Sequence, residues 1–171
     1  MVPRKSISIE FVRSVLSYDA ESGLFSWLVS PRRGMPAFSN AGSLSKRYGY
    51  VLISLKSSNY LAHRLAWVLH YGEWPTAGLD VDHIDGNRAN NKISNLRLLT
   101  RQGNRQNMRS AASHSKSGLL GAYFHAKSQR WAATIKAPNA GSKHLGYFGS
   151  AEEAHAAYLS AKRQLHDACT I

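Results

Sequence analysis

Two hydrophobic periodicities divide the chain into short helices and strands. Apolar residues at helical spacing follow Ser8, and a second helical run extends from His63 to Tyr71, where Gly72 ends it. Short apolar runs bounded by turn-forming residues predict strands. The expected strands lie at 24–28, 50–55, 60–62, 79–84 and 96–99, and a helix at about 101–109 follows the last of them.

A change in composition near residue 110 predicts a domain boundary. Residues 109–117 are small and polar, which is typical of a linker. Beyond them three strands are expected, at 121–125, 131–136 and 144–148, and Ser150 with Glu153 forms a capping box for a helix that ends at Leu165. We therefore expect an α+β protein with one domain at 1–110, a linker at 111–117 and a second domain at 118–171.

Charge favours a polyanionic partner. The chain has 22 Lys and Arg against 10 Asp and Glu, a formal net charge of +12. Basic side chains that neutralise phosphates release condensed counterions, so nucleic acid is favoured modestly over the alternative of a generally basic protein. The irregular, basic segment 30–47 is expected to be a surface loop that lies over DNA.

Cysteine content and hydropathy indicate an intracellular protein. Cys169 is the single cysteine, so no intrachain disulfide and no cysteine-pair zinc site can form. No apolar stretch approaches the length of a membrane span, and the first ten residues lack the apolar core of a signal peptide. We expect a cytoplasmic location, in the host cell if a phage encodes the chain, and no membrane partner.

The stretch from Asp82 to Asn107 contains the components of a phosphodiester-cutting site. Asp82 and His83 are adjacent in an expected strand, so they point to opposite faces and can serve one site only if one holds a metal and the other a water. Mg²⁺ prefers oxygen ligands, and a neutral histidine is a suitable general base. Such pairs, like asparagine-rich turns, are usually structural. The ordered series of Asp-His, Asn-Asn, Asn-Leu and Asn-x-x-Asn favours the site.

This segment resembles the HNH endonucleases of the phage and intron-homing type that lack a zinc-binding cysteine cluster. The motif VDHIDGNRANNKISNLRLLTRQGNRQN carries the resemblance, and YDAESGLFSW, GYVLISL and HRLAWVLHYGEWP extend it upstream. The family has a ββα-metal fold, which would correspond here to about residues 79–109. The resemblance implies that His83 is the general base, Asp82 and Asn104 bind one Mg²⁺ or Mn²⁺ per active site, and Asn95 holds the loop that aims His83. Support roles follow for Asn91 and Asn107. For His63, a structural hydrogen bond is expected.

The C-terminal segment resembles the APETALA-type (ethylene-response-factor) DNA-binding domain. The matched residues are SGLLGAYFHAKSQRWAATIK and HLGYFGSAEEAHAAYLSAK. The family places a three-stranded sheet in the DNA major groove with a helix behind it. By alternation, Trp131, Ala133, Ile135 and Phe124 should face the helix. The expected DNA-contacting residues are Tyr123, His125, Lys127, Arg130, Thr134, Lys136, Lys143 and His144.

One departure from that family bears on specificity. Its plant members read bases with several arginines, whereas Tyr123, His125 and Lys136 stand at the matching positions. Since arginine is the side chain that grips guanine with two hydrogen bonds, the sequence preference should differ or be loose, and much affinity should come from phosphates.

The sequence therefore predicts a metal-dependent endonuclease that hydrolyses phosphodiester bonds in duplex DNA. A monomer with one active site would nick. The alternative is a non-catalytic DNA-binding or regulatory protein that retains the HNH fold. The residues expected for each catalytic role are present, which favours the enzyme.

Overall fold

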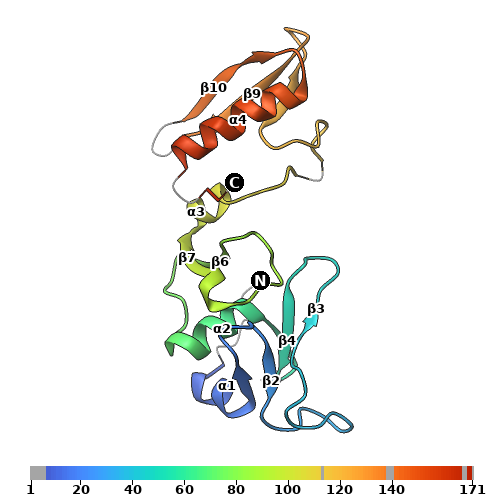
Figure 1. The fold of residues 1–171 in the computed structure, drawn as a ribbon, viewed down its shortest axis with the longest axis vertical. Helices are drawn as coiled ribbons and strands as arrows, with labels where there is room; N and C mark the ends of the chain where they lie inside the picture. The colour runs from blue at the N-terminus through green and yellow to red at the C-terminus, as the bar shows by residue number, and fades with distance from the viewer. Residues whose placement is uncertain (1–6, 113, 138–140, 167–168, 171) are drawn as a thin grey trace. The chain divides into compact units, whose positions relative to one another are not determined.

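The computed structural model describes residues 7–112, 114–137, 141–166 and 169–170. The chain divides into two compact units, Met1–Thr100 and Arg101–Ile171. Both combine short antiparallel sheets with helices (Figure 1). The boundary follows residue 100, ten residues earlier in the chain than the expected boundary at residue 110. The helix that begins at Arg101 therefore belongs to the second unit.

Polar contacts explain this earlier boundary. Asn107 Oδ1 accepts a hydrogen bond of 2.6 Å from the Thr170 hydroxyl, and Arg109 Nη2 donates to the Thr170 carbonyl at 3.1 Å. The Lys162 ammonium, buried at 1% exposure, donates to the Met108 carbonyl. The segment that follows helix α3 (Arg101–Gln106) is thus held by the C-terminal part of the chain.

The first unit contains three helical segments and seven strands in three separate antiparallel sheets among its described residues. The sheets are β1–β2, β3–β4–β5 and β6–β7. The elements are α1 (Ile9–Val15), β1 (Leu16–Tyr18), β2 (Phe25–Trp27), β3 (Ser43–Leu44), β4 (Val51–Leu55), β5 (Ser58–Leu61), α2 (Ala62–Tyr71), β6 (Leu79–His83), the 3-10 turn η1 (Ile93–Asn95) and β7 (Leu96–Thr100).

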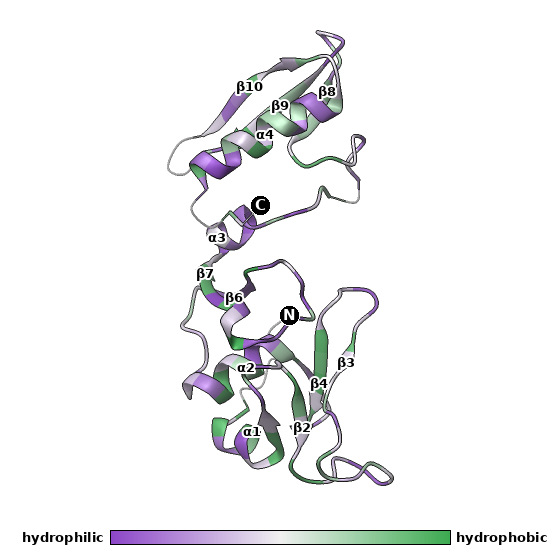
Figure 2. Ribbon diagram, viewed as in Figure 1, coloured by the Kyte–Doolittle hydropathy of each residue, from purple (hydrophilic) through white to green (hydrophobic). Residues whose placement is uncertain are grey.

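Helix α2 is the centre of the first core. It packs against α1, β1, β4, β5 and β6, and it buries Leu65, Ala66 and Val68 completely. The central strand β4 is among the most hydrophobic segments of this unit, and it buries Ile53 (Figure 2). The hairpin of β6 and β7 packs on this core through Val81 and Leu96.

The predicted helices and main strands of this unit are confirmed, with small shifts at their ends. Ser8 caps α1 by accepting a hydrogen bond from the Phe11 N–H at 3.2 Å. Two strands were not expected: β1, where a helix end followed by a turn was predicted, and the two-residue β3, inside the segment expected to be irregular. Both are too short for a periodic hydrophobic pattern to register.

The second unit has one three-stranded sheet and two helices among its described residues. The strand order is β10–β9–β8, all antiparallel, and Ser150 caps α4 by accepting from the Glu153 N–H. The elements are α3 (Arg101–Gln106), β8 (Ala122–His125), β9 (Arg130–Lys136), β10 (Ser142–Phe148) and α4 (Ala151–Leu165).

Strand register separates the two faces of this sheet. The face covered by α4 contains Trp131 and Ala133, which pack with Ala154, as alternation predicted. Phe124 lies on the same face near the end of the edge strand β8, where its ring meets the Trp131 ring at 5.5 Å and is 45% exposed. The face opposite α4 contains Tyr123, His125, Arg130, Ala132, Thr134, Lys136, His144 and Tyr147.

Lys143 is placed differently from the sequence interpretation. It pairs with Ile135, on the face that α4 covers, and its side chain is exposed at that edge. The neighbouring His144 pairs with Thr134 on the open face. Adjacent residues in a strand point to opposite faces of the sheet, so Lys143 and His144 do not belong to one contact surface.

No helix among the described residues combines the length and the apolar content that crossing a bilayer requires.

We predict that Gly121→Ala destabilises the second unit more than Gly118→Ala does. Both glycines have left-handed backbone, with φ of +78° and +66°, so alanine at either costs about 1 kcal/mol. A Cβ at Gly121 would also lie 2.1 Å from the Tyr158 ring, whereas one at Gly118 meets nothing within 4 Å. Urea unfolding of the two variants measures the difference. Equal losses of unfolding free energy would show that Tyr158 moves aside without cost.

Candidate active site

The β6–β7 ladder fixes the positions of Asp82 and His83. Asp82 pairs with Arg97 and His83 with Leu96, and both side chains are buried, at 8% and 4% exposure. Alternation along β6 directs them to opposite faces of the hairpin. The hydrogen-bonded pairing of β6 with β7 therefore holds the backbone of both Asp82 and His83 in place.

Asp82 forms an ion pair with the residue directly opposite it. Arg97 Nε and Nη2 both lie 3.3 Å from Asp82 Oδ2, and the two side chains are largely shielded from solvent. The guanidinium offsets the charge of the carboxylate and holds it in one orientation. Any cation bound by Asp82 must share the carboxylate with Arg97.

His83 is oriented by Asn91, which lies in the loop between the two strands. His83 Nε2 is 3.3 Å from Asn91 Oδ1, while Asn91 Nδ2 donates to the Ala89 carbonyl at 3.2 Å. The second bond fixes the amide so that its oxygen faces the ring. Nε2 of a neutral His83 therefore donates the hydrogen bond, and Nδ1 carries the lone pair that accepts a proton.

Burial lowers the pKa of His83, although the bond to Asn91 and the charge of Asp82 act in the opposite direction. Arg88 contributes to the lowering. The imidazole is consequently neutral at neutral pH, which is the state that a general base requires.

A network of side-chain hydrogen bonds around Asp85 fixes the conformation of the loop between β6 and β7. Asn95 Oδ1 accepts from the Asp85 N–H at 3.0 Å, and Asn95 Nδ2 donates to Asp85 Oδ1 and to the Asn90 carbonyl. Asn90 Nδ2 donates to Asp85 Oδ2 at 2.7 Å. Burial tends to raise the pKa of Asp85, but these hydrogen bonds outweigh it and the pKa is lowered. The Asn95 side chain thus bonds the backbone near the start of the loop and in its middle, and its part in catalysis stays a prediction.

The segment around β1 braces the loop from outside. Tyr18 donates a hydrogen bond of 2.7 Å to the Asn91 carbonyl, and burial raises the pKa of Tyr18 to about 12, which keeps the hydroxyl protonated. Gly23, with φ of +75°, lies so close to the loop that a Cβ would come within 2.5 Å of the Lys92 nitrogen. The backbone of Asn91 is therefore held from the N-terminal part of the unit.

Two further aromatic rings surround His83. The His63 ring meets it edge-on at 4.8 Å, and the Tyr50 ring lies 5.2 Å from His63 and 6.1 Å from His83. His63 is 5% exposed, and burial, with His83 and Arg64, lowers its pKa to about 3. The structure shows ring contacts of His63 with His83 and Tyr50, whereas the sequence suggested a structural hydrogen bond.

Sequence reasoning found some of these residues and missed others. Asp82, His83, Asn91 and Asn95 come together in the first unit. Asn104 lies on α3 and Asn107 just beyond it, both in the second unit. Tyr18, Tyr50 and Asp85 were not singled out, although Asp85 lies within the motif and its carboxylate in an asparagine-rich turn is a usable signal.

Asp82 is the metal-binding candidate of the first unit. The described residues contain no group of three or more His, Cys, Asp or Glu side chains suited to a metal ion. Mg²⁺ commonly binds through one or two carboxylates, with water and substrate phosphates completing its shell. A single buried carboxylate fits that mode, provided that Arg97 shares it.

We predict that His63 makes the first unit acid-sensitive. The folded protein keeps His63 neutral down to about pH 3, whereas the unfolded chain takes up a proton below about pH 6.5. The stabilisation is complete above the unfolded pKa and is lost as pH falls towards 3. His63→Phe should flatten the decline of unfolding free energy between about pH 6 and pH 4, by up to about 1.4 kcal/mol per pH unit.

Urea unfolding at each pH measures this slope. His70→Phe is the matched control, since it removes an exposed histidine from the same helix. If all three proteins lose stability with the same slope, the neutral state of His63 does not contribute.

Comparisons with known proteins give two sequence matches and one alignment with a solved structure. The sequence profile of a family described as HNH endonuclease matches residues 60–106. Protein 3.8 of Escherichia phage T7 is 33% identical over 104 residues, which span 61% of this chain and 83% of that protein. A solved structure of the HNH homing endonuclease I-HmuI aligns with 86% of this chain and 79% of its own, at 23% identity and a TM-score of 0.44.

The two sequence matches carry the assignment. The family profile covers α2, the β6–β7 hairpin and α3, and so includes Asp82, His83, Asn91 and Asn95. The phage protein extends the similarity beyond that segment. The chain belongs to the same family as T7 protein 3.8, and it carries an HNH endonuclease domain.

Proposed function

We propose that the protein is a metal-dependent endonuclease that hydrolyses phosphodiester bonds in duplex DNA. The observation that carries the proposal is the buried, neutral His83, which is held by Asn91 and follows Asp82 on strand β6. A base oriented by a second polar side chain is the recurring arrangement for activating a nucleophile. Within the HNH endonuclease domain, His83 is the residue so arranged.

His83 acts as the general base. Its Nδ1 accepts the proton of a water that attacks the scissile phosphate, while Nε2 keeps its hydrogen bond to Asn91. The imidazolium that forms is stabilised by the negative charges of Asp82 and Asp85. Asn95 preserves this geometry by fixing the loop, and the aromatic rings of Tyr50 and His63 limit the motion of the imidazole.

Asp82 and Asn104 are the proposed ligands of one Mg²⁺ or Mn²⁺ ion per active site. When bound, the metal supplies positive charge to the scissile phosphate and to the departing 3′ oxygen. Arg97 keeps the Asp82 carboxylate aligned for this role through its contact with Oδ2. One such site per chain would make a nick the product of a monomer.

The open face of the β8–β9–β10 sheet is the proposed DNA-positioning surface, as the APETALA-type resemblance implies. Supporting it, the face holds Tyr123, Arg130, Thr134, Lys136 and His144, with the Tyr123 hydroxyl 3.2 Å from Thr134 Oγ1. Tyr147 adds a ring beside His125 and His144, at 5.1 Å and 4.7 Å. His125 pairs with Arg130 on this face, and Lys127 lies in the adjoining turn.

A non-catalytic DNA-binding protein is the second candidate. The ion pair between Asp82 and Arg97 favours it, because this pair satisfies the carboxylate without a metal. The two functions differ in a single measurement, namely whether the purified protein cuts DNA.

We predict that the wild-type protein cuts plasmid DNA in Mg²⁺ or Mn²⁺ and that EDTA abolishes cutting. His83→Ala should lower the rate by about 10²- to 10⁴-fold, the usual contribution of a general base. His70→Ala removes an exposed histidine from α2 and should cut normally. Cutting that survives His83→Ala would refute the base assignment, and a wild-type protein that binds DNA without cutting it would favour the non-catalytic candidate.

We predict that Lys136→Ala weakens DNA binding and that Lys143→Ala does not. The two variants remove the same charge from opposite faces of one sheet, since Lys136 lies on the same face as Thr134 and Lys143 pairs with Ile135 on the other face. Loss of one phosphate contact should lower the slope of log affinity against log salt by about 1. Fluorescence anisotropy with a labelled duplex measures both slopes, and equal slopes would argue against the open face as the DNA-binding surface.

A further inference from the structure

A row of contacts connects a basic turn of the first unit to the candidate active site. The Arg47 guanidinium carbon lies 5.1 Å from the Tyr48 ring centre, and Arg88 Nη1 donates to the Tyr48 carbonyl at 3.1 Å. The Arg88 guanidinium carbon in turn lies 4.8 Å from the centre of the Tyr50 ring, which neighbours His83. We name Arg47, Tyr48, Arg88 and Tyr50 the arginine–tyrosine ridge.

The two arginines come from segments that are far apart in sequence but structurally constrained. Arg47 lies in the turn before β4, which is closed by hydrogen bonds from the Tyr48 and Gly49 N–H groups to the Ser45 carbonyl. Arg88 lies in the loop between β6 and β7, whose shape the Asp85–Asn95 bonds fix. The Arg88 side chain joins the two segments.

The chemistry of the ridge matches phosphate. A guanidinium has five N–H donors in a planar fork, and the hydrogen bond to the Tyr48 carbonyl occupies a single Arg88 nitrogen. Stacking on aromatic rings orders the guanidinium and leaves its edge directed away from the ring. Among the described residues neither Arg47 nor Arg88 forms an ion pair with a carboxylate, and both are exposed.

The order of contacts sets the position of each arginine relative to the reaction. Arg88 shares the Tyr50 ring with His83, whereas Arg47 is one ring further away, on Tyr48. We propose that the arginine–tyrosine ridge binds the DNA backbone next to the scissile bond, with Arg88 on the adjoining phosphate and Arg47 on a phosphate beyond it. This inference rests on the proposed function, because the adjoining phosphate is defined by the bond that is cut.

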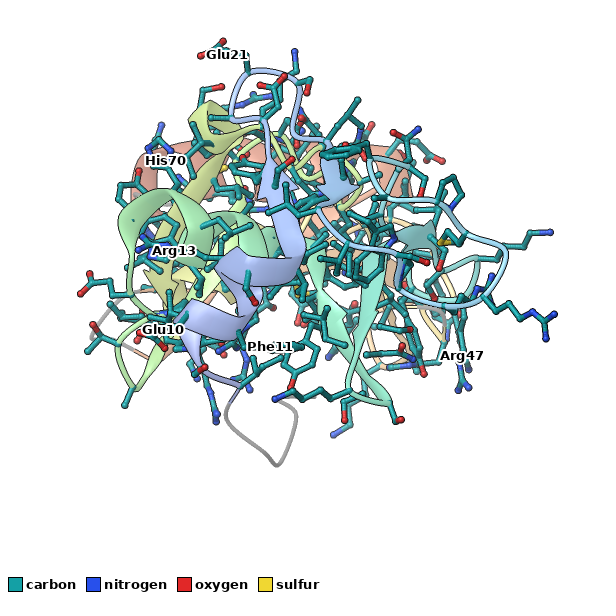
Figure 3. All side chains as sticks on the ribbon, turned by 90° about the horizontal axis from the view of Figure 1, so that it is seen from below. Glu10, Phe11, Arg13, Glu21, Arg47 and His70 are labelled. Atoms are coloured by element: carbon teal, nitrogen blue, oxygen red, sulfur yellow. The ribbon has the colours of Figure 1, made fainter. Side chains whose placement is uncertain are left out.

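The unit offers a matched control on another surface. Arg13 is an exposed arginine in the last turn of α1, and it lies towards His70 and away from Arg47 (Figure 3). Arg13→Ala removes the same charge and leaves the ridge unchanged. If only the net charge of the protein mattered, Arg13→Ala would change DNA binding as much as an alanine substitution of Arg47 or Arg88.

The test measures binding separately from cleavage. Affinity for a labelled random-sequence duplex is measured in EDTA over a range of salt concentrations, since phosphate contacts are independent of sequence. We expect Arg88→Ala and Arg47→Ala each to lower the salt slope by about 1 and Arg13→Ala to leave it unchanged. Arg88→Lys, which keeps the charge, should retain the wild-type slope.

Cleavage at saturating DNA distinguishes the two ridge arginines. Arg88→Ala should lower kcat about ten- to hundredfold because the reacting phosphate loses alignment, whereas Arg47→Ala should raise KM only. Equal salt slopes for Arg88→Ala and Arg13→Ala would overturn the ridge. If the wild-type protein does not cut but the ridge variants lower the slope, the ridge stands as a phosphate-binding surface and the endonuclease proposal fails.

Discussion

The orientation of one imidazole ring is the constraint on which the first unit is built. The His83–Asn91 hydrogen bond is useful only if Asn91 cannot rotate or drift, and the chain meets this requirement at three levels. The Ala89 carbonyl fixes the amide, the Tyr18 hydroxyl fixes the backbone, and Asn95 fixes the loop that carries both. Each of these hydrogen bonds is of modest strength. Together they exclude the other conformations that a polar loop would otherwise adopt.

Charge around this ring is arranged in compensating pairs. Arg97 forms an ion pair with Asp82 across the hairpin. The side-chain amides of Asn90 and Asn95 donate hydrogen bonds to the Asp85 carboxylate within the loop. Burial keeps His83 and His63 neutral, so the interior of the site gains no uncompensated positive charge. The excess of basic residues instead lies on exposed segments, where phosphate can reach it.

Local signals in the sequence predicted the local structure well. Ser8 and Ser150 cap their helices as expected, and the alternation of Trp131, Ala133 and Ile135 places the helix-covered face of the second sheet. The β6–β7 hairpin with Asp82 and His83 was also predictable, because apolar runs and a turn-rich loop define it. Lys143 could have been placed correctly by the same alternation that was applied to β9.

Long-range polar contacts were beyond reach of the sequence. The bond from Tyr18 to Asn91 and the Arg88 stack on Tyr50 depend on side chains brought together by the whole fold, and they leave no periodic trace. The boundary between the units also lies earlier than the sequence predicted. Hydrogen bonds from Thr170 and Lys162 hold residues 107 and 108, and no hydrophobic pattern in the sequence indicates these bonds.

The Tyr18–Asn91 bond spans 73 positions of the chain, and this separation has a consequence for how the protein folds. Contacts between distant residues form only after the entropy of closing the intervening segment has been overcome, which the core around α2 and β4 must do first. The β6–β7 hairpin is local and can form early, yet its loop acquires its final shape only when β1 docks. The bond that holds the Asn91 backbone is therefore expected to form late in folding, after the segment between Tyr18 and Asn91 has been closed.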